Sequence, residues 1–303
     1  MEPRYKSVEE RVPDTQYRDA LARIVCEGEQ TQNPFQTTAT RTLLTLPPMV
    51  FDLTNGFPVI TERKIGFWRT PIAELLAFIH GVRDAEVLAS WWGVSWWKNQ
   101  WATAEKCVQF GLEPHDLGWG SYGEAFNHFP TLEGTGFNQF EHLIKQIRWN
   151  PGLKTHIISP WIPQYCLQHE GLQRQVVVAP CHGWIQVTII NGKLNLRMDQ
   201  RSADFPIGVP ANIIQYAALT IMIAHVTGFE PYRYIHSAHD AHVYVNQLGH
   251  VEQIMSREPR PFPSLHLTEE GKDVEDLFQF RPHHFELRDY NPHPAILRIP
   301  VTT

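Results

Sequence analysis

The stretch Ala179-Pro180-Cys181-His182-Gly183-Trp184-Ile185-Gln186 sets a single cysteine between a proline and an apolar run that is typical of a strand. Further along the chain come Gln200-Arg201-Ser202-Ala203-Asp204 and then Gly208-Val209-Pro210-Ala211-Asn212. One short part of the chain therefore holds a candidate nucleophile, a fixed cation, a carboxylate and an amide. The question that this pattern raises is whether Cys181 is a catalytic thiolate or a small buried residue.

The composition indicates a folded protein without a strongly charged surface. The chain has 303 residues, 43% of them hydrophobic, and a formal net charge of -6. This length is sufficient for a large core in one domain or two. No run of Lys or Arg supplies the basic face of a duplex-binding protein, so nucleic acid is not expected as a substrate. A small anionic substrate is still compatible with the negative net charge, because a local arginine is sufficient to bind it.

The cysteines and the N-terminus indicate a cellular compartment. The four cysteines, Cys26, Cys107, Cys166 and Cys181, form no CxxC pair, which argues against a zinc knuckle or a thioredoxin-type site. A chain this long and poor in cysteine is not expected to carry a disulfide framework, which favours a reducing compartment. The N-terminus has no apolar signal core, and no stretch reaches the ~18 apolar residues of a membrane span. We therefore expect a cytoplasmic protein with no membrane partner.

Hydrophobic spacing predicts the main elements. Helices are expected over residues 17–28, 70–81, 137–148 and 211–227. Strands are expected over residues 43–46, 49–53, 154–161, 176–178, 185–190 and 194–198, with a hairpin turn at Asn191-Gly192 between the last two. Residues 31–42 and 107–136 are expected to form loops. No repeat or linker divides the chain, so we expect a flexible arm over residues 1–16 and one domain over residues 17–303.

A dense group of tryptophans follows the second predicted helix. The spacing of Trp91, Trp92, Trp96, Trp97 and Trp101 fits one face of a helix. Core packing accounts for such a face, and a wall for a flat heterocyclic ligand is the alternative, because aromatic faces stack on such rings.

Glu74 lies on or beside the apolar face of the helix predicted over residues 70–81. On composition alone it is expected to be an exposed or edge carboxylate of that helix.

Three histidines, His236, His239 and His242, recur every three residues, with Asp240 nearby. On a helix they would share enough of one face to offer two metal ligands. Zinc signatures pair histidines four residues apart with a general-base Glu, which is absent here. A structural metal is therefore the less favoured interpretation, and no metal is expected.

Two kinds of thiol chemistry remain for Cys181. For Cys/His hydrolysis or acyl transfer, His182 is the adjacent base, but neighbours on a strand point to opposite faces. For nucleophilic addition to a heterocycle, Arg201 could lower the pKa of the thiol and hold an anionic group. Asn212 offers a donor and an acceptor that suit N3–H and O4 of uracil. His242 and Tyr244 offer hydroxyl-binding groups.

Several ordered motifs agree with the second chemistry. They are PCHxxxQ around Cys181, QRSxD from Gln200 to Asp204, GxPxNI from Gly208, DxHxY ending at Tyr244, and Arg257-Glu258-Pro259-Arg260-Pro261. Together they closely resemble the thymidylate synthase family, and weaker agreement extends the resemblance over most of the chain after about residue 50. The resemblance implies a single α/β (α+β) domain with a large mixed β-sheet flanked by helices. It also implies a homodimer formed through the sheets.

The resemblance further implies the substrates and the catalytic residues. The family transfers a one-carbon unit from 5,10-methylenetetrahydrofolate to a pyrimidine nucleoside monophosphate, a deoxyuridylate. Cys181 would be the nucleophile on C6 of the base, and Asn212 would hold the base edge and stabilise charge at O4. Glu74 would order the water that moves protons, and Tyr122 would assist loss of the C5 proton.

The remaining roles concern the phosphate, the sugar and the folate. Arg201, followed in its motif by Ser202, would bind the phosphate, and His242 and Tyr244 would bind the sugar 3′-hydroxyl. On the folate side the resemblance implies Asp204, Trp97, Gly208 and Thr302.

The chain departs from the family pattern at three places. Gln36 stands where the N-terminal phosphate arginine is expected, and Arg41 is the candidate to compensate. Lys154-Thr155 replaces the arginine pair that the family donates across the dimer, so Lys154 is a further candidate phosphate ligand. Ala211 replaces the bulky aromatic before Asn212 and enlarges the folate side.

These features leave three functions open. The first is conversion of dUMP to dTMP. The second is a hydroxymethylase that makes 5-hydroxymethyl-dUMP, or another 5-hydroxymethyl pyrimidine nucleotide, from the same covalent intermediate. Asn212, where a cytosine-specific relative would have Asp, favours uracil in both. The third is a non-catalytic nucleotide-binding homologue, against which the joint presence of Cys181, Glu74, Asn212 and Tyr122 argues.

Overall fold

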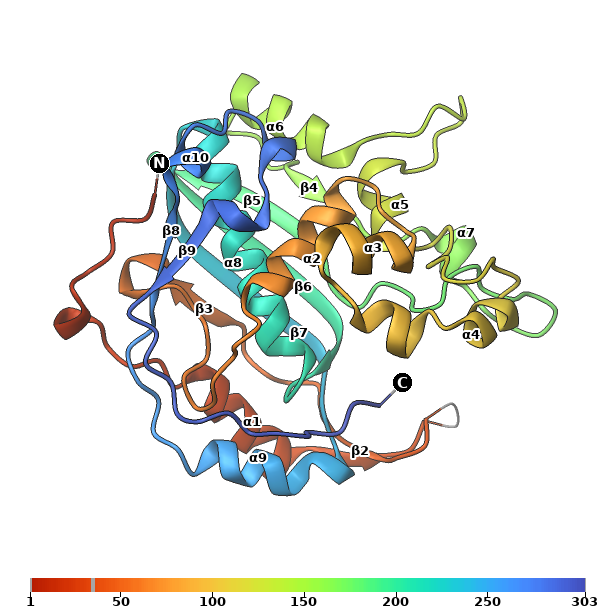
Figure 1. Cartoon of the computed structure of the whole chain (residues 1–303), viewed down its shortest axis with the longest axis horizontal. Coiled ribbons are helices and arrows are strands. Elements are labelled where there is room, and N and C mark those ends of the chain that lie inside the picture. The colour runs from red at the N-terminus through yellow and green to blue at the C-terminus, as the bar shows by residue number, and fades with distance from the viewer. Residues whose placement is uncertain (1, 34–35, 303) are drawn as a thin grey trace.

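One mixed β-sheet organises the fold in the computed structural model, which describes residues 2–33 and 36–302 (Figure 1). Its strands follow the order β1-β2-β7-β6-β5-β4, and β3 pairs with β7 beside β2. The strands are β1 (Glu29–Thr31), β2 (Thr40–Leu43), β3 (Met49–Asp52), β4 (Ile157–Ile158), β5 (Trp184–Ile190), β6 (Lys193–Asp204) and β7 (Glu230–Tyr244). β8 (Ser264–Leu267) and β9 (Phe285–Arg288) form a separate antiparallel pair.

The described residues also form ten α-helices. They are α1 (Gln16–Glu27), α2 (Arg69–Ile79), α3 (Ala85–Trp92), α4 (Ala104–Gln109), α5 (Tyr122–Asn127), α6 (Gln139–Trp149), α7 (Pro163–Cys166), α8 (Gly208–Thr227), α9 (Leu248–Met255) and α10 (Glu269–Lys272). The predicted class, a mixed sheet flanked by helices, is confirmed.

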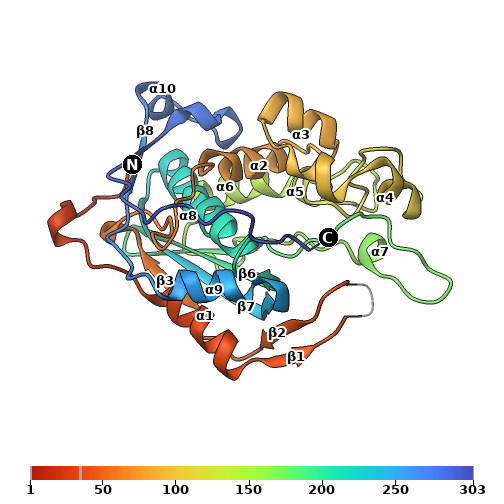
Figure 2. The same ribbon diagram turned by 60° about the horizontal axis from the view of Figure 1, so that its bottom comes forward.

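Helix α8 fills the centre of the core. It crosses from β6 to β7, the one parallel pair of the large sheet, because parallel neighbours need a long connection. Its sequence is apolar on nearly every side, so it packs against β6, β7, α2 and α6 (Figure 2). By length and composition α8 could span a membrane, but 89% of that apolar window is buried in the fold, which is the environment of a core helix. Gly228, in the left-handed conformation, ends it.

The spacing rules predicted the long elements and missed parts of others. The helices expected over residues 17–28, 70–81, 137–148 and 211–227 are confirmed as α1, α2, α6 and α8. The hairpin at Asn191-Gly192 is confirmed between β5 and β6, and both residues have the positive φ of the tight turn. The predicted loop over residues 31–42 instead contains the start of β2, and the predicted loop over residues 107–136 contains α5.

Three expectations for apolar segments are wrong. Of the strand expected over residues 43–46, only Leu43 pairs, as the last residue of β2. Residues 176–178 form no strand; Val176 and Val177 are buried in irregular backbone, where Val177 N donates to Leu117 O at 3.0 Å. The tryptophans do not share one helix, because α3 ends at Trp92, before Gly93, and residues Trp97–Trp101 form a π-helical turn. Apolar runs of this kind fit a buried loop as well as a strand.

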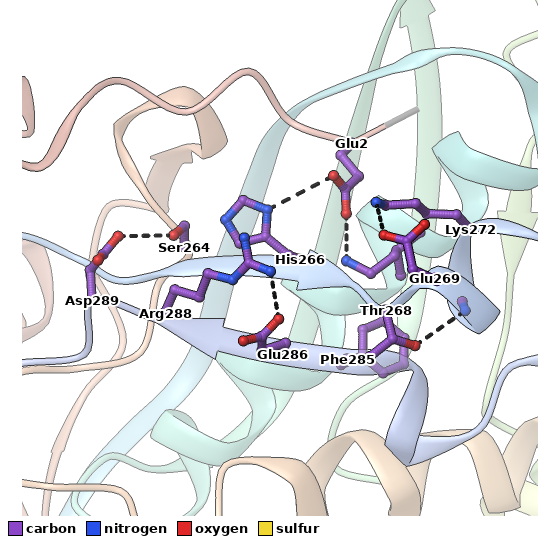
Figure 3. Close-up of polar contacts among 12 residues, drawn as sticks. Glu2, Ser264, His266, Thr268, Glu269, Lys272, Phe285, Glu286, Arg288 and Asp289 are labelled. Atoms are coloured by element: carbon purple, nitrogen blue, oxygen red, sulfur yellow. Dashed lines mark hydrogen bonds and ion pairs between the residues drawn. The ribbon is translucent and has the colours of Figure 1, made fainter.

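The N-terminal segment lies against the β8–β9 pair (Figure 3). Glu2 accepts a hydrogen bond from the backbone N of Leu267 and lies 3.8 Å from His266 Nδ1. Tyr5 Oη donates to Leu265 O at 2.9 Å, and Arg11, which is buried, donates to Phe262 O at 3.0 Å. These contacts differ from the loose arm expected over residues 1–16, and a domain boundary at residue 16 stays a prediction.

Candidate active site

Cys181 lies in irregular backbone before β5, and not in a strand. Its backbone N donates to Tyr122 Oη at 2.7 Å, and its carbonyl accepts from Arg201 N at 2.8 Å. Arg201 Nη2 lies 3.6 Å from the Cys181 Sγ. The thiol is therefore fixed between the guanidinium of β6 and the phenol of α5.

Two opposing effects set the acidity of this thiol. Burial raises the pKa of Cys181, and the positive charge of Arg201 opposes that rise. The expected cation is thus in place, but it acts against a larger desolvation effect. Since the thiolate is the nucleophile, the loss of Arg201 would leave the thiol less reactive.

Arg201 is anchored and still offers a free donor. Its Nε and Nη2 donate to the carbonyls of Pro180 and Ala179, both at 2.8 Å, and its guanidinium lies 5.4 Å from the ring centroid of Trp161. Within residues 2–33 and 36–302, Nη1 of this exposed side chain has no hydrogen-bond partner. A rigid guanidinium with a free edge suits an anionic ligand.

Arg174 is a second arginine in this region, and the sequence interpretation missed it. Its Nη2 donates to Val177 O at 3.1 Å, its guanidinium lies 4.4 Å from the ring centroid of Phe110, and its Nε is buried without a partner. Burial lowers the pKa of Arg174, and the charge of Arg201 lowers it further. Arg174 stands between recognisable motifs, so no sequence signal singled it out.

Glu74 is buried, and the expectation of an exposed or edge carboxylate is wrong. Its Oε1 accepts from the indole nitrogens of Trp96 and Trp97, at 2.6 and 2.5 Å, and its Oε2 accepts from Gln215 Nε2 at 2.6 Å. Burial raises the pKa of Glu74, and these three hydrogen bonds oppose the rise. A carboxyl group held in this way can gain or lose a proton nearer to neutral pH than an exposed glutamate.

Asn212 continues the same hydrogen-bonded chain. Its Nδ2 donates to Gln215 Oε1 at 2.9 Å, and its Oδ1 accepts from Gln200 Nε2 at 3.1 Å. Asn212, Gln215 and Gln200 are all buried. The structure therefore joins two predicted residues, Glu74 and Asn212, through Gln215, which no motif indicated.

Tyr122 presents a neutral hydroxyl beside Cys181. Its ring stacks on Phe78 and His182, with centroid distances of 5.0 and 4.6 Å. Burial holds the pKa of Tyr122 well above its ordinary value, and the neighbouring Cys181 raises it further. Because its oxygen accepts from the backbone N of Cys181, its own hydrogen is available to a ligand.

His182 does not supply a base to the thiol. Its Nδ1 lies 2.7 Å from Tyr216 Oη, and burial lowers the pKa of His182 to about 3. The ring is therefore a neutral core group, and the Cys/His interpretation loses its candidate base.

Asp204 and Gly208 lie together near the C-terminal segment. Burial raises the pKa of Asp204 to about 6, against the opposing charge of His242 and a hydrogen bond from Gln247. Gln247 Nε2 donates to Asp204 at 3.4 Å and to Pro300 O at 2.9 Å, which brings the chain before Thr302 towards Asp204. A β-carbon at Gly208 would lie 3.7 Å from Asn212 Oδ1.

Trp97 is 7% exposed, and its indole N–H is engaged by Glu74. Its predicted role on the folate side, like that of Thr302, stays a prediction.

The sugar candidates share one face of β7. His242 and Tyr244 are two residues apart, and Tyr244 Oη accepts from Gln36 Nε2 at 2.7 Å. His242 Nδ1 lies 3.1 Å from Asp240 Oδ1, and Ser202 pairs with Asp240 across β6 and β7.

The two substitute phosphate ligands lie elsewhere. Arg41 pairs with Val243, so it projects from the opposite face of the sheet to His242 and Tyr244. Lys154 is exposed before β4, where its carbonyl accepts from Gln186 Nε2. Neither residue joins the group around Arg201 through any contact of the described residues, and both assignments stay predictions.

The metal interpretation of the three histidines fails on geometry. They lie on β7, not on a helix; His236 and His242 are buried, whereas His239 Nε2 approaches Asp199 from a side chain that is 68% exposed. Alternation along a strand directs His239 to the other face, so the three cannot converge on one ion.

Two comparisons with known proteins match most of the chain. The family model described as thymidylate synthase matches residues 15–302. "Thymidylate synthase 1/2" of Encephalitozoon cuniculi (strain GB-M1) is 35% identical over 297 residues, which cover 94% of this chain and 96% of that protein. The family match spans the large sheet, α8 and the segment that carries Cys181.

The pairing of Cys181 with Arg201 predicts how the thiol reacts. In the variant Arg201→Ala, the opposing charge is lost and burial remains, so the pH midpoint for alkylation of Cys181 by iodoacetamide should move upward. At about pH 7.5 the rate should fall roughly three-fold or more, because less thiolate is present. Peptide mass spectrometry measures the rate of alkylation of Cys181. The background is Cys26→Ser, because Cys26 is exposed and would also react. Arg197→Ala, an exposed arginine of β6, is the control; an unchanged midpoint in Arg201→Ala contradicts the interpretation.

Proposed function

The chain belongs to the thymidylate synthase family, and we propose that it transfers the one-carbon unit of 5,10-methylenetetrahydrofolate to C5 of dUMP, with dTMP as the product. The family comprises methyltransferase-type enzymes that use methylenetetrahydrofolate as co-substrate. The observation that carries the proposal is the thiol of Cys181 held beside Arg201, with the Glu74–Gln215–Asn212 chain nearby in the same fold.

The thiol is needed because C5 of uracil is a poor nucleophile. The Cys181 thiolate forms a bond to C6, and the electron pair of the C5–C6 double bond moves towards C5 and O4. A donor at O4 stabilises the enolate, and Asn212 Nδ2 supplies one. C5 then attacks the one-carbon unit, the C5 proton leaves, and the carbon separates from the folate nitrogen as an exocyclic methylene. Hydride from the folate completes the methyl group as the bond between Sγ and C6 breaks.

The proton steps have candidate groups close by. Glu74 is a buried carboxyl with a raised pKa, and Tyr122 has a protonated hydroxyl next to Cys181. Asp204, with a pKa of about 6, offers a carboxyl that changes protonation near neutral pH on the proposed folate side. General acid–base catalysis works best with pKa values near the working pH.

The phosphate end is supported by two arginines of this chain. Among the described residues, Nη1 of Arg201 has no hydrogen-bond partner, and Arg174 adds a second positive charge whose Nε has none either. The charge of Arg201 contributes to the lowered pKa of Arg174, an effect that an anion between the two side chains would offset. His242 and Tyr244 are the proposed contacts for the sugar hydroxyl.

A hydroxymethylated product is the second candidate. Ala211 is a half-buried alanine at the start of α8, directly before Asn212, so no bulky side chain fills that place. Water that reached the exocyclic methylene in place of hydride would give 5-hydroxymethyl-dUMP and tetrahydrofolate.

Mass analysis of the products separates these candidates. With dUMP and methylenetetrahydrofolate, we expect dTMP and dihydrofolate, and release of tritium from C5-labelled dUMP. Cys181→Ser should release tritium more slowly by a factor of about 10³ or more, because the nucleophile is lost. Cys26→Ser should release it at the rate of the unaltered protein. Hydroxymethyl-dUMP with tetrahydrofolate would favour the second candidate. Nucleotide binding without any turnover would instead indicate a non-catalytic homologue.

We also propose a homodimer through the sheet face opposite α8. Four apolar side chains, Val50, Ile157, Trp184 and Ile190, are at least 38% exposed. The pairing of β4 with β5 and the alternation along β5 direct Ile157, Trp184 and Ile190 to one face, away from the buried Ile185 and Val187. An exposed apolar sheet face of this kind suits a second copy of the chain.

Sedimentation equilibrium tests the dimer. The unaltered protein should have a mass of about 70 kDa, twice the 35.0 kDa of the chain, at micromolar concentration. Trp184→Lys should shift the mass towards one chain by burying a charge in the interface, and Trp91→Lys, on the exposed side of α3, should not. A monomeric unaltered protein contradicts the proposal.

A further inference from the structure

The side-chain amide of Asn212 could by itself accept either pyrimidine. Uracil presents N3–H as a donor and O4 as an acceptor, whereas cytosine presents N3 as an acceptor and its amino group as a donor. A carboxamide matches one pattern in one orientation and the other pattern after a turn of 180°. Selection between the bases therefore requires something that fixes the amide.

The tryptophans fix the direction of hydrogen bonding at Glu74. An indole N–H can only donate, and Trp96 and Trp97 both donate to Oε1. The second carboxylate oxygen, Oε2, accepts from Gln215 Nε2 at 2.6 Å. While Glu74 is ionised, a turn of the Gln215 amide would set its carbonyl against this carboxylate, where neither group can donate.

The orientation of the Gln215 amide in turn sets the orientation of the Asn212 amide. With Nε2 directed at Glu74, Oε1 of Gln215 is left to accept from Asn212 Nδ2, at 2.9 Å. At the other end, Gln200 Nε2 donates to Asn212 Oδ1 at 3.1 Å and to Ser202 O at 2.9 Å. Gln215 is 0% exposed and Asn212 6%, so water does not readily replace these partners.

The fixed amide keeps two groups for a base. Asn212 Nδ2 has a second hydrogen, and Oδ1 has a second lone pair. Nδ2 lies towards Glu74, and Oδ1 lies towards Gln200 on β6. In the proposed reaction Glu74 orders the water that moves protons, so we place the C4–O4 edge of the base, next to C5, on the Glu74 side. Nδ2 then faces O4 and Oδ1 faces N3–H, which is the uracil pattern; cytosine would set its amino group against Nδ2.

We propose that Gln215 is a positioning residue that makes this protein select uracil over cytosine nucleotides, by holding the amide of Asn212 in one orientation against Glu74. The inference rests on the proposed function and deepens it. Gln215 itself lies behind Asn212, one helical turn further along α8, and acts through it.

Two replacements of Gln215 separate orientation from packing. Gln215→Leu keeps an apolar side chain of similar size and removes both hydrogen bonds. Gln215→Glu keeps an oxygen that accepts from Asn212 Nδ2, and a proton shared with Glu74 preserves the direction of the chain. The measured quantity is kcat/KM for tritium release from C5-labelled dUMP divided by that for dCMP, together with the ratio of their dissociation constants from equilibrium dialysis. Thr220→Val, buried on α8 outside the chain of amides, is the packing control.

We expect the preference for dUMP over dCMP to fall roughly ten-fold or more in Gln215→Leu, and to stay within about three-fold of the unaltered protein in Gln215→Glu and Thr220→Val. An unchanged preference in Gln215→Leu, with only a lower kcat, overturns the proposal. An equal loss in Gln215→Glu does so as well. If Gln215→Leu does not fold, Gln215→Met carries the same expectation.

The dialysis ratio keeps this test separate from the proposed reaction. An unaltered protein that releases no tritium contradicts the proposed function. The dependence of the dUMP to dCMP binding ratio on Gln215 then still decides the inference.

Discussion

A buried carboxylate needs donors, and that need at Glu74 arranges the centre of this protein. An unpaired charge in the core is costly, so Glu74 is stable there only because three N–H groups reach it. Two come from Trp96 and Trp97 and one from Gln215, so one side chain of α2 ties together the tryptophan segment and α8. The π-helical turn at Trp97–Trp101 is part of this arrangement, and such turns are frequent at functional sites.

The sheet supplies the other half of the site. β6 and β7 are parallel neighbours, so Arg201 and Asp204 on one strand and His242 on the next lie at the same end of the sheet. Helix α8, which connects these strands, begins beside Asp204 and carries Asn212 in its first turns. Two hydrogen bonds of the Cys181 backbone, to Tyr122 Oη and from Arg201 N, hold this residue beside the arginine. The crossover connection from β6 through α8 to β7 thus brings residues of distant motifs together in one site.

The sequence predicts the parts of this arrangement that have a local cause. Periodicity finds α8 and the other long helices, and the ordered motifs find Cys181, Arg201 and Asn212. Composition does not tell that Glu74 is buried, because its three donors come from other elements, 22 or more residues away in the chain. Gln215 and Arg174 were missed for the same reason: each acts through tertiary contacts, and neither belongs to a motif. The false strand at residues 176–178 shows the same limit, since an apolar run does not reveal whether its backbone pairs.

The central claim is that Cys181 adds to C6 of a uracil nucleotide while the base is held for transfer of a carbon to C5. The most direct measurement is the mass of the denatured protein after incubation with 5-fluoro-dUMP and methylenetetrahydrofolate, because fluorine at C5 does not leave as the proton does and the adduct persists. The account predicts a mass gain equal to the nucleotide plus the folate, on the peptide that contains Cys181. No adduct, or an adduct on Cys26, Cys107 or Cys166, would contradict it.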